Sequence, residues 1–497
     1  MSKLVKHLSR RDFLKAAGTV SFATILTACA APTPVTPAAP QPTAPAAAAP
    51  ATAVPAQPTV AAAAPATAVP ATSSVTQAPA PVQKPVSGNR VKVQWWMDIQ
   101  NEVDLKYYIA GVDKVNAEQD KIEVDLVKGQ NNDAFVTAVT GGNAPDIYLC
   151  WDGAEPLGSW ANNGMIMDLT DMMNSSSLDM KRFQKAAVDM VTYNGKYYGV
   201  PWQADVMLLF WNKNHFKEAG LDPEKPPANM TEAMAMGQKL TQKDSSGKIS
   251  RMGLQPPTWN GPWYTFMGFY KPQLVDIGNK KVTADSPEMI AALTDMQTMW
   301  NMYDKDPTKV DAFNATLGNG LSPDDPFLTG KVSMVYDGDW RNVYEYRYTQ
   351  SKYKTDYGMI PFPPPAGKES MNGTSYFFCY PQVIPHNSPH PQEAWQAIML
   401  ITDPQIDKTI AFIGNNPANA SLLDDAELLA TPGFEVPFSI LKNYQEMQFT
   451  LPVTPVTAQL STAIQAQIDL VIHNKATPAE ACKGINDAVQ PEWDAIT

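Results

Sequence analysis

Beyond residue 90, the pattern of apolar and polar positions alternates between strand-like and helix-like segments. Strands show apolar residues at every second position or in short runs, whereas helices repeat them every three to four residues. The expected elements are strands over residues 91–96, 122–127 and 144–151 and helices over residues 102–118 and 133–140. This order predicts a mostly parallel sheet with right-handed crossovers.

The stretch over residues 193–227 organises the centre of the chain. It opens with an Asn-Gly turn, because both residues tolerate positive φ. A loop that bears Trp202 and Asp205 then leads into an apolar strand over residues 206–211. A helix over residues 215–219 follows, with capping residues before it and a glycine after it. The pattern predicts a strand-loop-helix unit of an α/β core.

The remainder of the chain continues the alternation of helices and strands. Further helices are expected over residues 231–241, 287–303, 391–402 and 404–413, with two more between residues 463 and 488. Residues 256–264 form a loop rich in aromatic and turn-forming residues, and residues 372–378 lead into a second long strand.

Five segments carry a resemblance to one known family. Residues 193–227 are similar to its pattern of Tyr-Asn-Gly-Lys-x-Tyr-Gly-Val-Pro, a polar loop and then Tyr-Asn-Lys-x-x-Phe. The other similar segments are residues 142–147, 327–340, 414–419 and 475–481. Beyond about residue 90 the chain therefore resembles the extracellular solute-binding proteins of ABC importers, the family of the maltose-binding protein.

Three positions depart from the family pattern. Trp211 stands where the family has Tyr, and Asn372 stands where it has Gly. Residues 229–232 read Asn-Met-Thr-Glu in place of a Thr-Trp pair before an acidic residue.

The resemblance implies an α/β periplasmic-binding-protein-like fold of type II, in which two α/β lobes are joined by a hinge. A solute binds in the cleft between the lobes, and an ABC permease reads the closed form. The chain is expected to cross between the lobes near residues 204–211 and 374–382. The expected boundaries are residues 90–204 and 380–430 for lobe 1, and residues 205–379 and 431–497 for lobe 2.

Residues 1–28 are expected to be an export signal. Residues 9–15 match the twin-arginine motif S-R-R-x-F-L-K, which a receptor reads as an address. The apolar run over residues 16–28 is too short to span a bilayer. Residues 26–29 resemble a bacterial lipobox, so Cys29 is expected to carry a lipid anchor. The alternative is an ordinary signal peptide with an incidental cysteine.

Residues 29–89 comprise Cys29 and an Ala/Pro/Thr-rich segment with too little apolar surface to form a core. We expect a disordered tether between the membrane and the binding domain, although a linker without any length requirement has the same composition. The expected location is the extracytoplasmic face of the cell membrane, after export by the twin-arginine route.

Composition excludes several classes of function. The formal net charge of −12 and the lack of a basic cluster beyond the N-terminus argue against nucleic-acid binding. Cys150, Cys379 and Cys482 lie in apolar stretches without metal-ligand spacing, so they are expected to be buried thiols. No motif of a nucleotide-binding loop or a nucleophile elbow occurs, and no cofactor or metal is expected.

The candidate ligand-binding residues lie at expected strand ends and cleft loops, where ligands bind in open α/β sheets. They pair aromatic rings, which cover the apolar face of a sugar, with carboxylates, which bond its hydroxyl rim. The candidates are Trp96, Asp98, Trp151, Asp152, Trp202, Asp205, Trp263, Asp339 and Trp340. Core packing is the competing interpretation for each tryptophan, and it is the one preferred for Trp160, Trp211, Trp300 and Trp395.

Three functions remain in view. The preferred one is a monomeric, lipid-anchored binding protein of an ABC importer that captures a sugar or oligosaccharide and is not an enzyme. The alternative is a secreted glycoside-active enzyme, because two carboxylates suffice to cleave a glycosidic bond. A structural or adhesive surface lipoprotein is the third.

Overall fold

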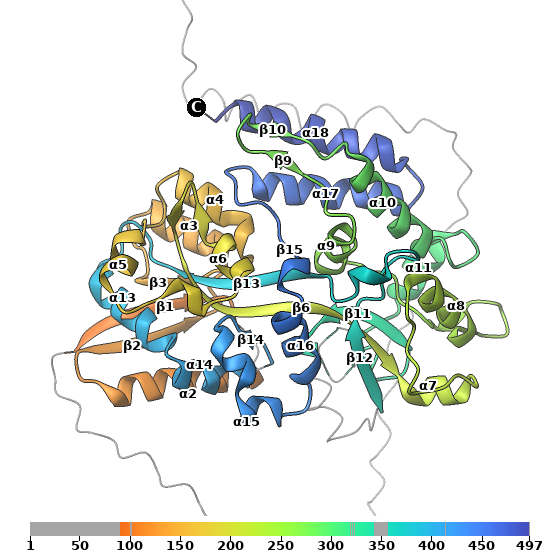
Figure 1. The fold of residues 1–497 in the computed structure, drawn as a ribbon, viewed down its shortest axis with the longest axis horizontal. Helices are drawn as coiled ribbons and strands as arrows, with labels where there is room; N and C mark the ends of the chain where they lie inside the picture. The colour runs from red at the N-terminus through yellow and green to blue at the C-terminus, as the bar shows by residue number, and fades with distance from the viewer. Residues whose placement is uncertain are drawn as a thin grey trace, which may run out of the picture. The chain divides into compact units, whose positions relative to one another are not determined.

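The computed structural model describes residues 90–99, 102–318, 320, 322, 324–341, 356–412 and 414–496, all within the compact unit Ala80–Thr497 (Figure 1). The expected signal peptide, the lipidated Cys29 and the linker lie outside the described residues.

A parallel sheet forms the first part of the fold. Strand β1 (Val91–Met97) pairs in parallel with β2 (Ile122–Lys128) along its whole length, and also with β3 (Ile147–Leu149). Helices α2 (Glu102–Glu118) and α3 (Asn132–Thr140) make the connections. The predicted strand-helix order is confirmed. The third strand is shorter than expected.

The strand β6 (Val200–Asn212) is the longest in the described chain, and all of its residues are buried. Its first half pairs with β13 (Ser375–Val383) and β14 (Asn416–Pro417). Its second half pairs with β11 (Met334–Gly338) and β12 (Tyr357–Pro361). In Figure 1, β6 and β13 run across the middle of the view between β1–β3 and β11–β12.

The prediction that a loop precedes this strand is wrong. Trp202 and Asp205 lie within β6, because Gln203 and its neighbours are hydrogen-bonded from both sides by β13 and β14. The sheet order is β11-β6-β13-β3-β1-β2, so β6 and β13 join the two ends of one sheet.

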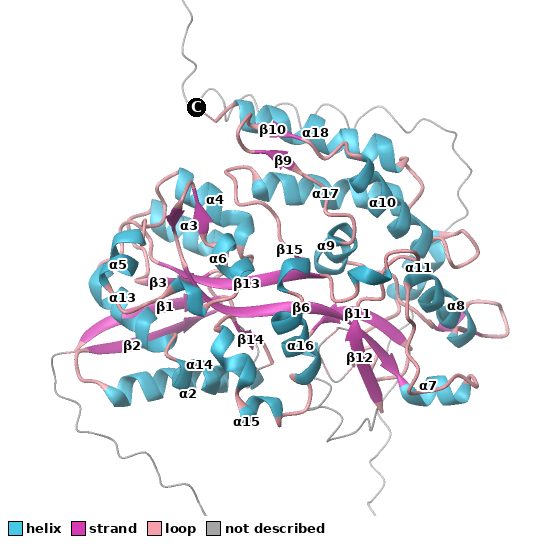
Figure 2. Ribbon diagram, viewed as in Figure 1, coloured by secondary structure: helices cyan, strands magenta, loops and turns pink. Residues whose placement is uncertain are grey.

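Helices cover the sheet and build a separate layer beside it (Figure 2). Helix α2 packs on α13 (Pro391–Ile401) and α14 (Pro404–Ala411). Helix α17 (Thr457–Ile472) packs on α18 (Pro478–Asp494). Helix α10 (Pro287–Trp300) contacts both α17 and α18.

Local signals in the sequence place several boundaries correctly. Asn194 and Gly195 both have positive φ, at 50° and 76°, and turn the hairpin of β4 (Thr192–Tyr193) and β5 (Lys196–Tyr197). The Asn212 side chain caps α7 (Lys213–Glu218), and Thr477 forms a capping box with Glu480 at the start of α18.

The expected loop over residues 256–264 is partly helical, since α9 begins at Asn260 and Pro262 is tolerated in its first turn. The remaining elements are β4 (Thr192–Tyr193), β5 (Lys196–Tyr197), β7 (Gln242–Lys243), β8 (Ile249–Arg251), β9 (Val275–Asp276), β10 (Lys281–Val282), β15 (Gln448–Phe449), α4 (Ala154–Asn162), α5 (Thr170–Ser175), α6 (Lys185–Met190), α8 (Met230–Leu240), α9 (Asn260–Gly268), α11 (Pro307–Asn314), α15 (Ala426–Leu429) and α16 (Glu435–Asn443), with short 3-10 turns at Met180–Arg182, Glu369–Met371, Ala420–Asp424 and Gln445–Met447.

None of the helices among the described residues has the length and apolar character needed to cross a bilayer.

Candidate functional site

Five aromatic side chains form a row along β13. Phe378 and Tyr380 are two residues apart on this strand, so they share a face, and their rings stack at 6.5 Å and 15°. Trp151 meets Tyr380 edge-on at 4.7 Å, and Trp259 stacks on Phe378 at 6.2 Å and 24°. Trp340 lies 5.8 Å from Trp259 and 6.2 Å from Phe378. We call these five residues the aromatic row.

The aromatic row keeps some of its surface open. Trp151, Trp259, Trp340 and Phe378 are partly exposed, whereas Tyr380 is buried. Large aromatic rings are normally buried in cores, so a contiguous set of partly exposed rings indicates a surface for binding.

Polar side chains lie at the Trp151 end of the aromatic row. Asp98 follows β1 and Asp152 follows β3, and both are exposed. Asn132 donates a hydrogen bond to Asp152, and Tyr148 donates one to Asn132 at 2.7 Å. These groups present carboxylate and amide oxygens beside Trp151, which immediately precedes Asp152.

Glu155 links α4 to α9. Its Oε1 accepts a hydrogen bond from Asn260 of α9 at 3.4 Å. Burial raises the pKa of Glu155 to about 7, and the nearby Asp152 adds to this rise.

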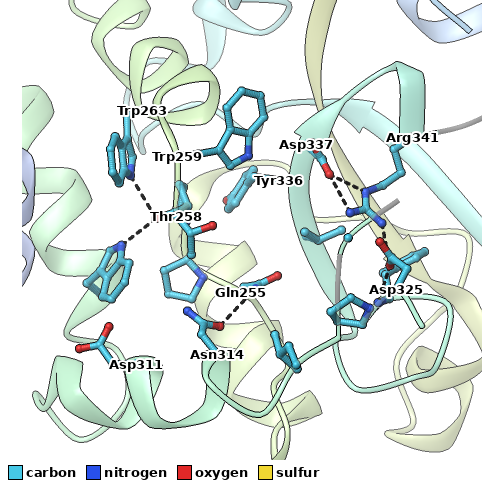
Figure 3. Close-up of a pocket in the computed structure, with 18 of the residues that line it drawn as sticks. Gln255, Thr258, Trp259, Trp263, Asp311, Asn314, Asp325, Tyr336, Asp337 and Arg341 are labelled. Atoms are coloured by element: carbon cyan, nitrogen blue, oxygen red, sulfur yellow. Dashed lines mark hydrogen bonds and ion pairs between the residues drawn. The ribbon is translucent and has the colours of Figure 1, made fainter. Parts of the chain in front are cut away.

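A cavity of about 730 Å³ lies in the expected lobe 2, next to the aromatic row (Figure 3). Trp259 and Trp340 belong to both, so the cavity adjoins the row. Trp263 and Trp300 form a second aromatic wall, and both donate their indole N–H to the Pro257 carbonyl at 3.0 Å. The volume of this cavity is in the range of small-molecule binding sites.

Several polar side chains that line this cavity form hydrogen bonds and ion pairs with one another. Gln255 donates to Asn314 at 3.0 Å. The buried Arg341 guanidinium bonds Asp325 at 2.9 Å and Asp337 at 2.7 Å, and Figure 3 shows it clamped between these carboxylates. Because two carboxylates neutralise it, this arginine adds no net positive field to the cavity.

Asp205 of β6 and Asp339, which directly follows β11, are both buried, and the Asp339 backbone N–H donates to the Val206 carbonyl at 3.0 Å. The Tyr380 hydroxyl donates to Asp205 Oδ2 at 2.6 Å, and Asn416 of β14 donates to Asp339. Burial raises the pKa of Asp205 to about 7 and raises that of Asp339 well above its ordinary value.

The structure brings part of the predicted set together. Trp151, Asp152 and Trp340 belong to the aromatic row or its rim, and Trp263 forms the wall of the adjoining cavity. Asp98 lies close enough to Asp152 to raise its pKa. These residues come from β1, β3, α9 and the end of β11.

Four predicted residues lie elsewhere. Trp202 has no exposed surface and packs edge-on against Trp95 at 5.2 Å and Tyr108 at 5.7 Å, so its ring is a core side chain. Asp205 and Asp339 are also fully buried rather than open to a ligand. Trp96 is half-buried, packs against the smaller core cluster and donates to Gln94 at 3.1 Å.

Sequence reasoning missed Trp259, Phe378, Tyr380, Asn132 and Glu155. Phe378 and Tyr380 could have been found from the sequence, because two aromatic residues separated by one position in a strand lie on the same face. Trp259 was in the aromatic-rich loop but was not singled out. The expected core tryptophans Trp160, Trp211, Trp300 and Trp395 are all buried, as are the three cysteines.

The residues that the structure describes contain no group of three or more His, Cys, Asp or Glu side chains that could hold a metal ion.

The sequence model of the family of bacterial extracellular solute-binding proteins matches residues 110–436. The chain belongs to this family. A probable amino-acid ABC transporter periplasmic-binding protein of Sinorhizobium fredii is 23% identical over 60% of this chain and 64% of its own length. The maltotriose-binding protein of Pyrococcus abyssi is 21% identical over 70% of this chain and 71% of its own length. The match to the first of these spans less than two thirds of that relative.

The solved structure of CpMnBP1 with mannotriose bound has a TM-score of 0.68 to this chain and 26% identity. It covers 80% of this chain, and the whole of that protein is matched. The fold is therefore the α/β fold of type II binding proteins, as the sequence predicted.

Proposed function

We propose that this solute-binding protein is the extracytoplasmic receptor of an ABC importer, and that its ligand is a sugar or oligosaccharide. The observation that supports this most is the aromatic row with its polar rim, which extends along β13 between the two ends of the sheet. A sugar ring offers an apolar face and a rim of hydroxyls, so it needs both kinds of group.

The relatives support a sugar over an amino acid. One binds maltotriose, and the related solved structure holds mannotriose. A ligand of several rings matches a row of several aromatic side chains and an adjoining cavity of about 730 Å³.

We assign the ligand contacts on lobe 1 to Asp98, Trp151 and Asp152. On lobe 2 we assign them to Trp340 and Trp263 together with Trp259 and Phe378, which the sequence did not single out. Asp205 accepts the Tyr380 hydroxyl of this surface, Asp339 precedes Trp340, and Trp202 packs in the core.

The experiment is calorimetric titration of the purified chain with glucose, mannose, maltotriose, mannotriose and a set of amino acids. Saturable binding of one saccharide at one site per chain supports the proposal, and binding of an amino acid alone contradicts it. Small-angle scattering with saturating ligand should show a smaller radius of gyration, because the closed form is favoured by its higher affinity.

The glycoside-active alternative has a direct test. Asp205 and Asp339 are buried, which leaves neither exposed to a glycosidic oxygen. Incubation with oligosaccharides should give no cleavage products by chromatography. Turnover would mean an enzyme.

We also propose export by the twin-arginine route, a lipid anchor on Cys29, lobes at the boundaries given above, a monomeric state and delivery of solute to an ABC permease. Cys29→Ala should release the protein from the membrane fraction, and the double substitution Arg10→Lys and Arg11→Lys should block export. If the Cys29→Ala protein is still extracted only by detergent, the anchor is wrong.

A further inference from the structure

The cavity beside the aromatic row has an acidic lining. The described residues that line it include four with carboxylates: Asp311, Asp325, Asp337 and Asp469. The basic residues of the described lining are Arg341 and His473. The Arg341 guanidinium lies 2.9 Å from Asp325 and 2.7 Å from Asp337, so the two buried carboxylates share one cation. Asp311 lies on the opposite side of the view in Figure 3, away from this ion pair.

Asp311 of α11 and Asp469 of α17 both keep part of their carboxylate open. Their side chains are 49% and 56% exposed. Each gives one oxygen to His473, whose ring nitrogens lie 3.0 Å from Asp311 Oδ2 and 3.1 Å from Asp469 Oδ1. Within the described part of the chain, the second oxygen of each makes no hydrogen bond or ion pair. Because a carboxylate has about four acceptor sites, both can still accept from a ligand.

The lining therefore keeps an excess of negative charge. Four carboxylates face at most two cations, whether or not His473 is protonated. Aromatic walls attract cations in addition, through the negative face of their rings. Four tryptophans belong to this lining: Trp259, Trp263, Trp300 and Trp340. A solute group with a positive charge is thus favoured here, and a phosphate or carboxylate group is repelled.

An unpartnered hydroxyl in the same lining indicates a ligand group that can donate a hydrogen bond. Tyr336 of β11 lines the cavity and is 3% exposed, and its hydroxyl has no hydrogen-bond partner among the described residues. Its ring packs on Phe266 at 5.7 Å and on Phe362 at 4.5 Å, and Figure 3 shows it beside Trp259. A buried polar group without a partner is costly, so a ligand that supplies one is favoured.

We propose that the cavity binds an amino sugar, and that Asp311 and Asp469 are the specificity-determining residues that accept its protonated amine. This inference rests on the proposed function, because it names the class of sugar for the same site. An ammonium group supplies three N–H donors and a charge, whereas the hydroxyl that it replaces supplies one donor and no charge. An amino acid also carries an amine, but its carboxylate would meet a lining whose described cations are already paired.

Calorimetric titration at pH 6 with matched pairs of sugars tests this inference. Glucosamine is compared with glucose, and chitotriose, the β-1,4 trimer of glucosamine, with cellotriose, the β-1,4 trimer of glucose. The members of each pair differ only in the amine at C2. At low salt the wild type should bind the amine at least about tenfold more tightly, because charge-assisted hydrogen bonds are stronger than neutral ones. The ratio should shrink in 0.5 M NaCl, because salt screens half-exposed carboxylates.

Variants at the two aspartates assign the preference to their charges. Asp311→Asn and Asp469→Asn each remove one charge at a half-exposed position, and each should lower the ratio of chitotriose to cellotriose affinity about threefold or more. Asp469→Glu keeps the charge and should keep the ratio. Asp113→Asn, at an exposed position of α2, is the matched control and should show the wild-type ratio. A ratio within one variant cancels any general loss of affinity.

The outcomes separate this inference from the proposed function. If neutral saccharides bind and the amines bind no more tightly, the amino-sugar inference is overturned and the proposed function stands. Triacetylchitotriose has the same nitrogens without the charge, so its binding as tightly as chitotriose would also overturn the inference. The same holds if both Asp→Asn variants keep the wild-type ratio. If no saccharide of either kind binds, the proposed ligand class is wrong, and the inference fails with it.

Discussion

Replacing Glu155 by Gln should remove a pH-dependent weakness from the contact between α4 and α9. In the folded chain the Glu155 carboxyl accepts a hydrogen bond from Asn260 and is partly withdrawn from water. Its pKa rises from 4.5 to about 7, with burial as the main cause. Glutamine has nearly the same shape, keeps an acceptor for Asn260 and never ionises.

The size of the effect follows from the pKa values. A rise from 4.5 to about 7 corresponds to about 3 kcal/mol, at ~1.4 kcal/mol for each pH unit. Because the folded pKa is raised, the stability that this group contributes is fully present below pH 4.5 and is lost as the pH rises through about 7. The wild type should therefore lose up to about 3 kcal/mol from this group between pH 4 and pH 8, and Glu155→Gln should lose none of it.

Urea unfolding of both proteins at pH 4.5, 6 and 8 measures this difference. The free energy of unfolding of Glu155→Gln minus that of the wild type should rise with pH. Taking this difference cancels the contributions of all other titrating groups. Glu118→Gln, at an exposed position of α2, is the control and should show a constant difference. A constant difference for Glu155→Gln as well would refute the account of Glu155 as a buried, neutral contact.

Three further tests, with five substitutions in all, examine other features. Gly158→Ala should destabilise the fold by about 1–3 kcal/mol in urea, because its Cβ would lie 2.2 Å from a backbone oxygen of the segment before α17. Gly484→Ala, whose Cβ meets only a flexible side chain, should be neutral or stabilising, and equal losses would count against this reasoning. Trp259→Ala should weaken saccharide binding about tenfold in calorimetry with a small change in stability, whereas Trp202→Ala should cost about 3–5 kcal/mol of stability. If Trp259→Ala instead destabilised the fold and left saccharide affinity unchanged, the aromatic row would not be part of the site. Arg341→Met should cost about 3–5 kcal/mol in the same urea assay, because two carboxylates lose their cation, and an unchanged midpoint would mean that the ion pair is not a structural element.

The periodic part of the fold could be predicted from the sequence. The strands and helices from residue 91 to residue 140 follow directly from apolar spacing, and the Asn194-Gly195 turn follows from backbone chemistry. Capping residues located the starts of α7 and α18. These signals are local, so a single sequence contains them.

The parts that were missed depend on pairing between distant residues. Trp202 and Asp205 read as loop residues, because nothing near them in sequence indicates that β13 and β14 would pair with both edges of β6. Pairing also decided the site: Trp202 faces Trp95 and Tyr108 in the core, and Asp205 accepts the Tyr380 hydroxyl. A residue type can predict a stacking ring or a carboxylate, but only the register of distant strands decides whether it is open to a ligand.

The position of β6 in the chain also constrains the order in which the protein can fold. Every strand that pairs with β6, from β11 to β14, lies between residues 334 and 417, so both of its edges are unpaired until the ribosome has added more than a hundred residues. At roughly 5–20 residues per second, completing the chain from β6 to β14 takes on the order of 10–40 seconds. During this time an apolar strand of 13 residues is available to other chains. Contacts of such high contact order form slowly, so the nascent protein should depend on chaperones that cover exposed strands until β14 is made.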